Sequence, residues 1–307
     1  MIEEFPWGWP IAFALFFGGL GGGAFMLTSV TSFLTRDDFK NILKFGVIVG
    51  TVSAILAVIA FMIDLGAVER ALSVYSNPSS MITIGTMILT IIIPLGLVYA
   101  SFVPPGRLNF PWSGNIRART ALEVLLFILG AALASYTGFV LGLVGSSPFW
   151  GSPLLEVLFV LSGASTAIMA IALFMTPLYS STKMEVAKKR IIEALHRLDL
   201  ADGLLIIIEL AIVLTLVFTS AYSISGATAA SANSLISGSL SMIFWIGVIG
   251  LGLLVPLLIL IFLAWKGRSA AYIRLYPPLL AVASISALVG GLLMRYSIVI
   301  AGQIPIF

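Results

Sequence analysis

The stretch LSMIFWIGVIGLGLLVPLLILIFLAW (residues 240–265) contains no charged side chain and is long enough to cross a lipid bilayer as one helix. Seven more apolar stretches occur, at about 10–34, 45–66, 81–103, 120–144, 153–177, 203–222 and 271–300. Backbone amides and carbonyls find no water in the hydrocarbon core, so each stretch is predicted to be a transmembrane α-helix. The sequence therefore predicts an all-α integral membrane protein, in which residues 1–307 form a single membrane domain of eight spans.

The composition agrees with a membrane protein and excludes several kinds of metal and cofactor site. Only 9% of the residues are charged, against roughly 25% in a soluble globular protein. The chain has no cysteine, which excludes thiolate-ligated iron–sulfur clusters, cysteine-ligated zinc and disulfides. A single histidine, His196, cannot supply both axial ligands of a bis-histidine haem. We therefore expect no haem and no iron–sulfur cluster in this chain, and the small net charge of +3 does not indicate nucleic acid as a partner.

The basic residues are distributed unevenly between the two sides of the membrane. Fourteen of the 16 Lys and Arg residues fall in or beside the loops that follow the first, third, fifth and seventh spans. Only Arg70 and Arg295 lie toward the other side. Basic loops remain in the cytoplasm, so both termini are predicted to lie on the non-cytoplasmic side. The longest connection, residues 178–202, is predicted to form a short amphipathic cytoplasmic helix, with His196 in a solvated position.

Charged side chains inside a span are costly, so each one suggests a function. Asp64 lies 20 residues after Lys44, which places it about 30 Å from the cytoplasmic side at 1.5 Å per residue. The same reasoning places Tyr136 and Arg295 near the outer surface. These three residues form a candidate outer site, although Asp64 and Arg295 could also form a purely structural ion pair or reach the surface separately.

A second group of acidic residues lies toward the cytoplasmic side. Glu209 follows Asp202 by seven residues, about 10 Å into the membrane, and has no oppositely charged neighbour in the sequence. We predict a proton relay that includes Glu209, Asp202 and Glu123. For Glu123, however, an ion pair with Arg119, four residues earlier on the same helix, is a sufficient explanation.

Small and aromatic residues suggest packing and interfacial roles. The glycines of residues 18–23 are predicted to let the first span approach its neighbours closely, as small residues do in membrane helices. Trp7, Trp9, Trp112 and Trp150 fall at predicted span ends, where tryptophan is typical of the membrane–water interface.

Four segments together resemble the NrfD/PsrC family, the integral membrane subunits of polysulfide-reductase-type oxidoreductases. They are WGWPIAFALFFGGLGGGAFML (7–27), DLGAVERALSVYSNPSSMITIGTMIL (64–89), SYTGFVLGLVGSSPFWGSPLLEVLFVLSGAST (135–166) and GGLLMRYSIVIAGQ (290–303). The Tyr-Thr-Gly and Pro-Phe-Trp of the third segment, and the Arg-Tyr-x-Ile-Val-x-x-Gly-Gln-like end of the fourth, are the most specific. The resemblance extends over the whole chain.

This resemblance implies a quinone-binding anchor in the inner membrane of a prokaryotic cell, with menaquinone or another quinone as bound substrate. Such an anchor docks a ferredoxin-like iron–sulfur subunit, which contacts a molybdopterin catalytic subunit, both on the extracytoplasmic face. By resemblance, Tyr136 is placed against the quinone and Asp64 exchanges its protons. Arg295 either pairs with Asp64 or polarises the quinone, while Arg70 and Trp150 face the docked subunit.

Two other interpretations remain open from the sequence. In a proton-coupled secondary transporter, Asp64, Glu209 and Arg295 would be coupling sites, although the inverted repeats common in transporters are not evident. A purely structural anchor would bind no quinone. The sequence leaves the terminal substrate and the direction of electron flow undetermined.

Overall fold

The computed structural model describes residues 7–35, 39–66, 73–77, 80–103, 112, 114–143, 147–182, 184–266 and 274–303. Within these ranges eight helices are long and apolar enough to cross a membrane, which confirms the predicted number of spans. They are α1 (Trp9–Thr35), α2 (Lys40–Leu65), α3 (Met81–Ala100), α4 (Ile116–Gly142), α5 (Pro153–Ser181), α6 (Glu185–Ala221), the π-helix η3 (Ile243–Leu254) continued by α8 (Val255–Lys266), and α9 (Tyr276–Ala301). Two short helices, η2 (Ser73–Ser76) and α7 (Gly226–Ile236), lie between spans, and no β-strand occurs among the described residues.

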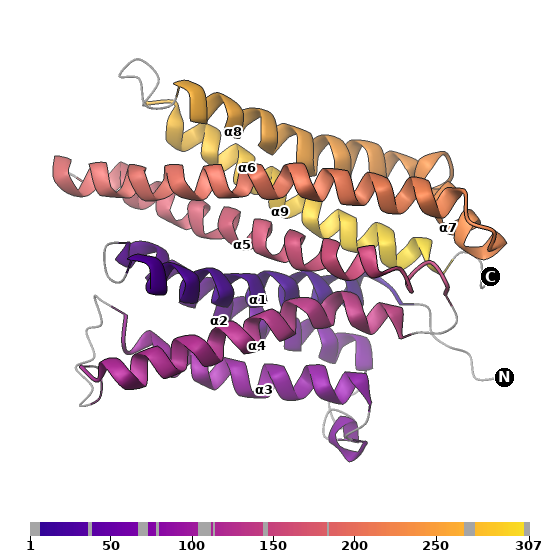
Figure 1. Ribbon diagram of the computed structural model, residues 1–307, viewed down its shortest axis with the longest axis horizontal. Helices are drawn as coiled ribbons and strands as arrows, with labels where there is room; N and C mark the ends of the chain where they lie inside the picture. Colours follow the sequence, from indigo (N-terminus) through magenta and orange to yellow (C-terminus); the bar gives the residue numbers. More distant parts are fainter. Residues whose placement is uncertain are drawn as a thin grey trace.

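The long helices run side by side along the longest axis of the molecule (Figure 1). Helices α1 to α4 form one part of the bundle, and α5, α6, α8 and α9 form the other. Helix α1 lies between the two parts, because it contacts α2 and α4 on one side and α5 and α9 on the other. Any site on α1 therefore faces one part or the other, according to its position around the helix.

The glycines of α1 explain its central place. A methyl group at Gly22 would lie 2.8 Å from the amide nitrogen of Ala134 in α4 and 2.5 Å from the carbonyl oxygen of Gly130. Only a residue without a side chain permits this approach, and close backbone contact is a main source of helix association in lipid. The predicted role of these glycines in packing is confirmed.

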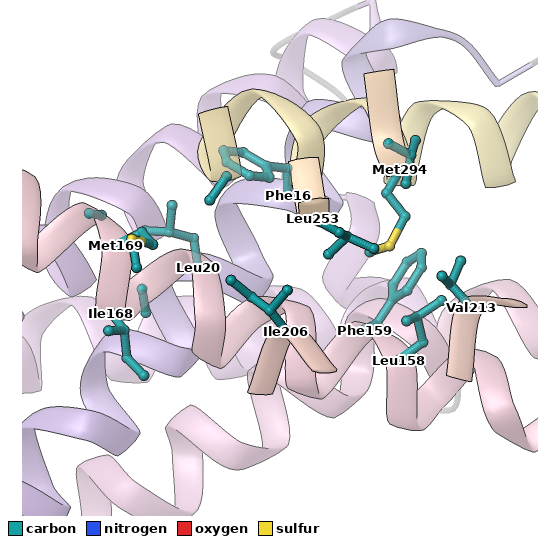
Figure 2. Close-up of a cluster of buried hydrophobic side chains, with 14 of the residues drawn as sticks. Phe16, Leu20, Leu158, Phe159, Ile168, Met169, Ile206, Val213, Leu253 and Met294 are labelled. Atoms are coloured by element: carbon teal, nitrogen blue, oxygen red, sulfur yellow. The ribbon is translucent and has the colours of Figure 1, made fainter. Parts of the chain in front are cut away.

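Large apolar side chains fill the space between α1, α5, α6, η3 and α9. Figure 2 shows Phe16 of α1, Phe159 of α5, Leu253 of η3 and Met294 of α9 meeting in this region, and all four are at most 6% exposed. Lipid is as apolar as these side chains, so dispersion contacts rather than the hydrophobic effect hold them together.

The two ends of the described chain meet at one end of the bundle, here called the terminal end. The side-chain amide of Gln303 donates a hydrogen bond to the backbone oxygen of Trp7 at 2.8 Å, and α9 ends at this end of the bundle in Figure 1. Lys40 and Lys266 lie at the opposite end, at the start of α2 and the end of α8. Which of the two ends faces the cytoplasm stays a prediction from the distribution of basic residues.

The prediction that residues 178–202 contain a separate short helix is wrong, while their predicted cytoplasmic location stays a prediction. From Glu185 onward this segment belongs to α6, a continuous helix of 37 residues that ends at Ala221. No proline or glycine occurs before Gly203 in this helix, so nothing interrupts its backbone hydrogen bonds. Helix α7 was not predicted, and Ser225 caps its start, because the Ser225 hydroxyl accepts a hydrogen bond from the amide of Thr228.

Candidate functional site

A cavity of about 100 Å³ lies between α1, α2, α3 and α4, toward the terminal end of the bundle. Its wall is mainly apolar, with Ile11 and Leu15 of α1 and Phe61 of α2 among the lining residues. Few polar residues line it: Asp64 of α2, Thr86 of α3, and Tyr136 and Thr137 of α4. An apolar cavity with a small number of polar groups is the usual form of a small-molecule binding site.

Tyr136 is held at this cavity by the shape of α3. Its ring lies against Gly85, where a methyl group would come within 2.6 Å of the phenolic oxygen. Within the described part of the chain, the phenolic hydroxyl has no hydrogen-bond partner. Because a phenol can both donate and accept, Tyr136 is free to bind either a carbonyl or a hydroxyl of a ligand.

Asp64 reaches the same cavity from the end of α2. The helix ends directly after it, at Gly66, whose left-handed conformation (φ 67°) closes the last turn through a hydrogen bond to the carbonyl of Ile63. The structure therefore brings Asp64 and Tyr136 together on one cavity wall, as their predicted depth suggested.

Arg295 is completely buried between α1, α5 and α9. Its guanidinium lies between two aromatic rings, 5.5 Å from the centre of Phe16 and 5.2 Å from the centre of Phe159. Its Nη1 donates to the Ser162 hydroxyl at 3.1 Å and to the Gly291 carbonyl at 3.0 Å. Aromatic faces and oxygen acceptors stabilise a cation away from water, so these groups explain how the protein buries this charge.

The predicted pair of Asp64 and Arg295 is wrong. The Asp64 cavity includes Gly18 of α1, whereas the Arg295 guanidinium lies against Gly19, where a methyl group would come within 2.8 Å of Nη2. Successive residues of an α-helix point about 100° apart, so the two charges occupy different faces of α1. The structure does not bring Arg295 to the Tyr136 cavity.

Four ionisable side chains lie buried along one face of α6. His196, Asp199, Asp202 and Glu209 are 8%, 1%, 0% and 3% exposed. Their spacing of three, three and seven residues places them on the same side of the helix. The prediction of a solvated His196 is therefore wrong, because the continuous helix turns this residue toward the interior.

Polar residues of α5 and α9 face this row. The hydroxyl of Tyr276, at the start of α9, donates a hydrogen bond to the Asp199 carboxylate. Asp202 lies beside Ser165 of α5, but neither of its carboxyl oxygens has a hydrogen-bond partner of good geometry in the described ranges. A buried carboxyl without partners is costly, which marks Asp202 as a functional candidate.

Glu209 has partners that the sequence did not reveal, since they come from other helices. Its carboxyl lies next to Ser162 of α5 and close enough to Arg295 to interact with the guanidinium. A small cavity of about 10 Å³, room for about one water molecule, is lined by Glu209 together with Ser162, Ser165 and Thr166. Polar groups therefore continue from Asp199 through Asp202 and Glu209 to Arg295.

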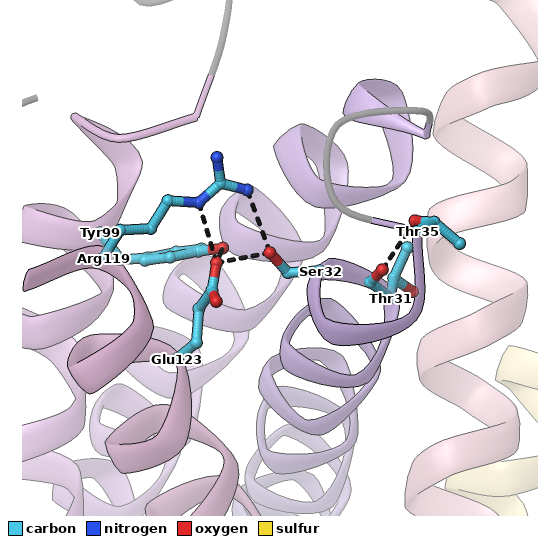
Figure 3. Close-up of polar contacts among 6 residues, drawn as sticks. All are labelled: Thr31, Ser32, Thr35, Tyr99, Arg119 and Glu123. Carbon is cyan, nitrogen blue, oxygen red and sulfur yellow. Dashed lines mark hydrogen bonds and ion pairs between the residues drawn. The ribbon is translucent and has the colours of Figure 1, made fainter. Parts of the chain in front are cut away.

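Glu123 belongs to a different polar cluster, in α1, α3 and α4 (Figure 3). Its Oε1 accepts hydrogen bonds from Ser32, from Tyr99 at 2.7 Å and from Nε of Arg119 at 2.9 Å. Arg119 also donates to the Ser32 hydroxyl at 3.0 Å. The expected ion pair with Arg119 is confirmed, and the structure does not bring Glu123 to the row on α6.

Of the two residues predicted to face a partner, Arg70 lies outside the described residues. Trp150 is described and only 2% exposed. Its indole N–H donates to the carbonyl of Ile298 at 2.9 Å, and its ring stacks on Trp7 at 5.5 Å. Trp150 is thus part of the interior, and its predicted place at an exposed interface is wrong. Trp9, which is 54% exposed, does have the expected exposure.

Several residues of these sites were missed in the sequence. Thr86 and Gly85 look like ordinary residues of an apolar span, and only their positions beside Tyr136 in the structure identify them as site residues. Asp199 and Tyr276 were also missed. The recurrence of acidic residues every third or fourth position would have revealed Asp199 if residues 185–221 had been treated as one helix.

Comparisons with known proteins find similar proteins that match nearly the whole of this chain. The family model described as "Polysulphide reductase, NrfD" matches residues 1–306. A polysulfide reductase chain of Wolinella succinogenes is 29% identical, over 97% of this chain and 94% of that protein. Protein NrfD of Escherichia coli is 27% identical, over 99% of this chain and 97% of that protein. A selenate reductase subunit of Mesobacillus selenatarsenatis is 24% identical, over 97% of this chain and 74% of that protein.

Proposed function

This chain belongs to the polysulphide reductase NrfD family, and we propose that it is the membrane subunit of a respiratory oxidoreductase that exchanges electrons between a quinone and a docked iron–sulfur subunit. One observation carries the proposal: Asp64 and Tyr136, from α2 and α4, line the same apolar cavity. A quinone has an apolar ring and two oxygens, so it suits a wall that offers mainly carbon and a few hydrogen-bonding groups.

Tyr136 and Asp64 have separate tasks in this proposal. Tyr136, fixed against Gly85, orients the ligand by a hydrogen bond to one of its oxygens. When quinol is oxidised to quinone, two electrons and two protons leave, and the Asp64 carboxylate accepts the two protons one after the other. Asp64 lies at the end of α2, so it can release each proton at the terminal end of the bundle before it accepts the next.

The electrons leave to a group in a partner, because this chain has no cysteine with which to hold an iron–sulfur cluster. Two of the similar proteins are named as one component each of a polysulfide reductase and a selenate reductase, which supports a complex with further subunits. We propose that these are a ferredoxin-like iron–sulfur subunit and a molybdopterin catalytic subunit. They would dock at the terminal end, on the extracytoplasmic face of a prokaryotic inner membrane.

The proposal is tested with the complex that contains this chain, in native membranes. Tyr136→Phe and Asp64→Asn are expected to abolish turnover driven by quinol, since each removes a group that contacts the ligand. Turnover driven by a soluble dye, which delivers electrons directly to the catalytic subunit, should remain. Tyr179→Phe is the matched control, because Tyr179 lies near the end of α5, at the end of the bundle opposite to the cavity, and does not line the cavity. Unchanged quinol-driven rates in both site variants would disprove the assignment.

The buried row on α6 supports a second part of the proposal. This part is a proton relay that starts from the end of the bundle opposite to the terminal end. Asp202 and Glu209 lie on one helix face, and the small cavity beside Glu209 has hydroxyls on its wall and room for about one water. Protons can pass along such a series of carboxyls, hydroxyls and water. The position of Glu123 in a separate cluster gives it no contact with this route.

The relay is tested in vesicles that contain the complex, by the number of protons moved per electron. Glu209→Gln and Asp202→Asn are expected to lower this ratio while leaving quinol-driven electron transfer active. Glu193→Gln is the matched control on the same helix, because Glu193 forms an exposed ion pair with Arg197. A ratio that stays the same in both relay variants would remove the relay from the proposal. The family relationship favours this function over a proton-coupled secondary transporter.

A further inference from the structure

Thr86 is a polar residue of α3 at the cavity wall, where the other lining residues of this helix are Ile82, Gly85 and Leu89. It directly follows Gly85, the residue against which the Tyr136 ring lies. Thr86 therefore borders the part of the cavity that Tyr136 occupies, and a ligand that reaches the phenol also comes close to Thr86.

The hydrogen-bond state of Thr86 limits what it can offer a ligand. Its hydroxyl donates to the carbonyl of Ile82, one turn earlier, at 2.8 Å. With its hydrogen engaged inside the helix, the Thr86 oxygen has only lone pairs left to offer. Asp64, when ionised, is likewise only an acceptor. Thr137 also gives its hydrogen to a carbonyl of its own helix, that of Ala134 at 2.7 Å, but it is 2% exposed.

A quinone and its quinol differ in the hydrogen bonds they need. The oxygens of a quinone only accept, whereas each hydroxyl of a quinol can donate. Tyr136 serves both forms, because a phenol donates or accepts. While Thr86 keeps its hydrogen bond to the Ile82 carbonyl, it can serve only the hydroxyl of the reduced form, and it places a lone pair against the carbonyl of the oxidised form.

We propose that Thr86 accepts a hydrogen bond from a hydroxyl of bound quinol, and so makes this cavity bind the quinol more tightly than the quinone. This inference rests on the proposed function, and it identifies the redox form of the ligand that the site recognises. It also makes Thr86 a determinant of selectivity rather than of general affinity.

The same helix provides a matched control. Thr90 lies one turn beyond Thr86, and its hydroxyl donates to the Thr86 backbone carbonyl at 2.8 Å. Its oxygen bonds the hydroxyl of Tyr75, from η2, at 2.6 Å, and it does not line the cavity. Thr86→Val and Thr90→Val thus make the same chemical change on one helix, inside and outside the cavity.

The experiment titrates the purified full-length chain, under anaerobic conditions, with duroquinol and with duroquinone. Binding is followed by quenching of tryptophan fluorescence, since Trp7 lines the cavity, and Trp7→Phe identifies its part of the signal. We expect Thr86→Val to weaken duroquinol binding about tenfold, the usual effect of one lost hydrogen bond, and to leave duroquinone binding within about twofold. Thr86→Ser, which keeps the hydroxyl, and Thr90→Val should bind both forms as the unaltered chain does.

Other outcomes overturn the inference. Equal weakening of both ligands by Thr86→Val would show an effect of shape, and unchanged binding of both would show no role for the hydroxyl. Thr86→Ala repeats the test if valine does not allow folding. If the unaltered chain binds neither ligand, the proposed function fails together with this inference. If Tyr136→Phe weakens binding and Thr86→Val does not, only this inference fails.

Discussion

The ring of Tyr136 in α4 lies against Gly85 in α3, so closely that a methyl group on Gly85 would come within 2.6 Å of the phenolic oxygen. The phenol is thus positioned by contact with a backbone rather than by a hydrogen bond from the described residues. Its hydroxyl remains available to a ligand while its ring stays in place.

Gly85→Ala is expected to displace Tyr136 without removing any functional group. We predict a rise of about tenfold in the KM for quinol, as for the loss of one well-placed hydrogen bond. The measurement is quinol-driven turnover by the complex. Gly203→Ala is the control, because a methyl group there would meet no atom within 4 Å. Equal kinetics for the two variants would contradict the positioning role of Gly85.

Glu123 is predicted to stabilise the fold. It accepts hydrogen bonds from three side chains, on α1, α3 and α4, and it is 4% exposed. Glu123→Gln should lower the free energy of unfolding by about 3 kcal/mol, since it removes the buried carboxylate that pairs with Arg119. Tyr99→Phe, which removes one donor, should cost about 1 kcal/mol. Unfolding of the purified chain in detergent measures both, and a larger effect of Tyr99→Phe would contradict this account.

Arg295 and Glu209 are predicted to be energetically coupled. Arg295→Met removes the buried cation beside Glu209 and should destabilise the chain by about 3–5 kcal/mol. Adding Glu209→Gln removes the uncompensated anion and should recover more than about 1 kcal/mol.

The same unfolding measurement tests this coupling through a double-mutant cycle. Arg197→Met is the control, since its exposed ion pair with Glu193 should contribute less than about 1 kcal/mol. Additive effects of the Arg295 and Glu209 substitutions would show that the two groups do not interact. Quinol affinity should not change in Glu209→Gln, because Glu209 does not line the Tyr136 cavity.

Trp150 is predicted to affect stability and not assembly. Trp150→Phe removes the hydrogen bond to the Ile298 carbonyl, at a cost of about 1 kcal/mol, while the partner subunits should still co-purify. Trp265→Phe, at an exposed position near the end of α8 and at the opposite end of the bundle, should change neither property. Loss of the partners in Trp150→Phe, with stability retained, would restore Trp150 to the docking surface.

The number of spans could be predicted because lipid leaves the backbone little choice. An apolar stretch of about 20 residues must satisfy its own hydrogen bonds, and the helix does so locally. Apolar stretches alone did not predict where a helix begins when polar residues extend it beyond the apolar part. Residues 185–202 are amphipathic and suggested a separate helix with a solvated His196, yet they are the first part of α6, and contacts with other helices bury His196 and Asp199.

The sequence by itself determined the spans and how far along its own helix each functional residue lies, and only the tertiary structure decided which of them meet. Glu209, predicted toward the cytoplasmic side, lies near Arg295, which was predicted near the outer surface. The rise per residue of a helix is fixed, so the similar depth of Asp64, Tyr136 and Arg295 followed from counting. Their positions around the bundle depend on which helices the glycines of α1 allow to approach, and these are contacts between distant parts of the chain. That packing places Asp64 beside Tyr136 on one face of α1, and Arg295 near Glu209 on another.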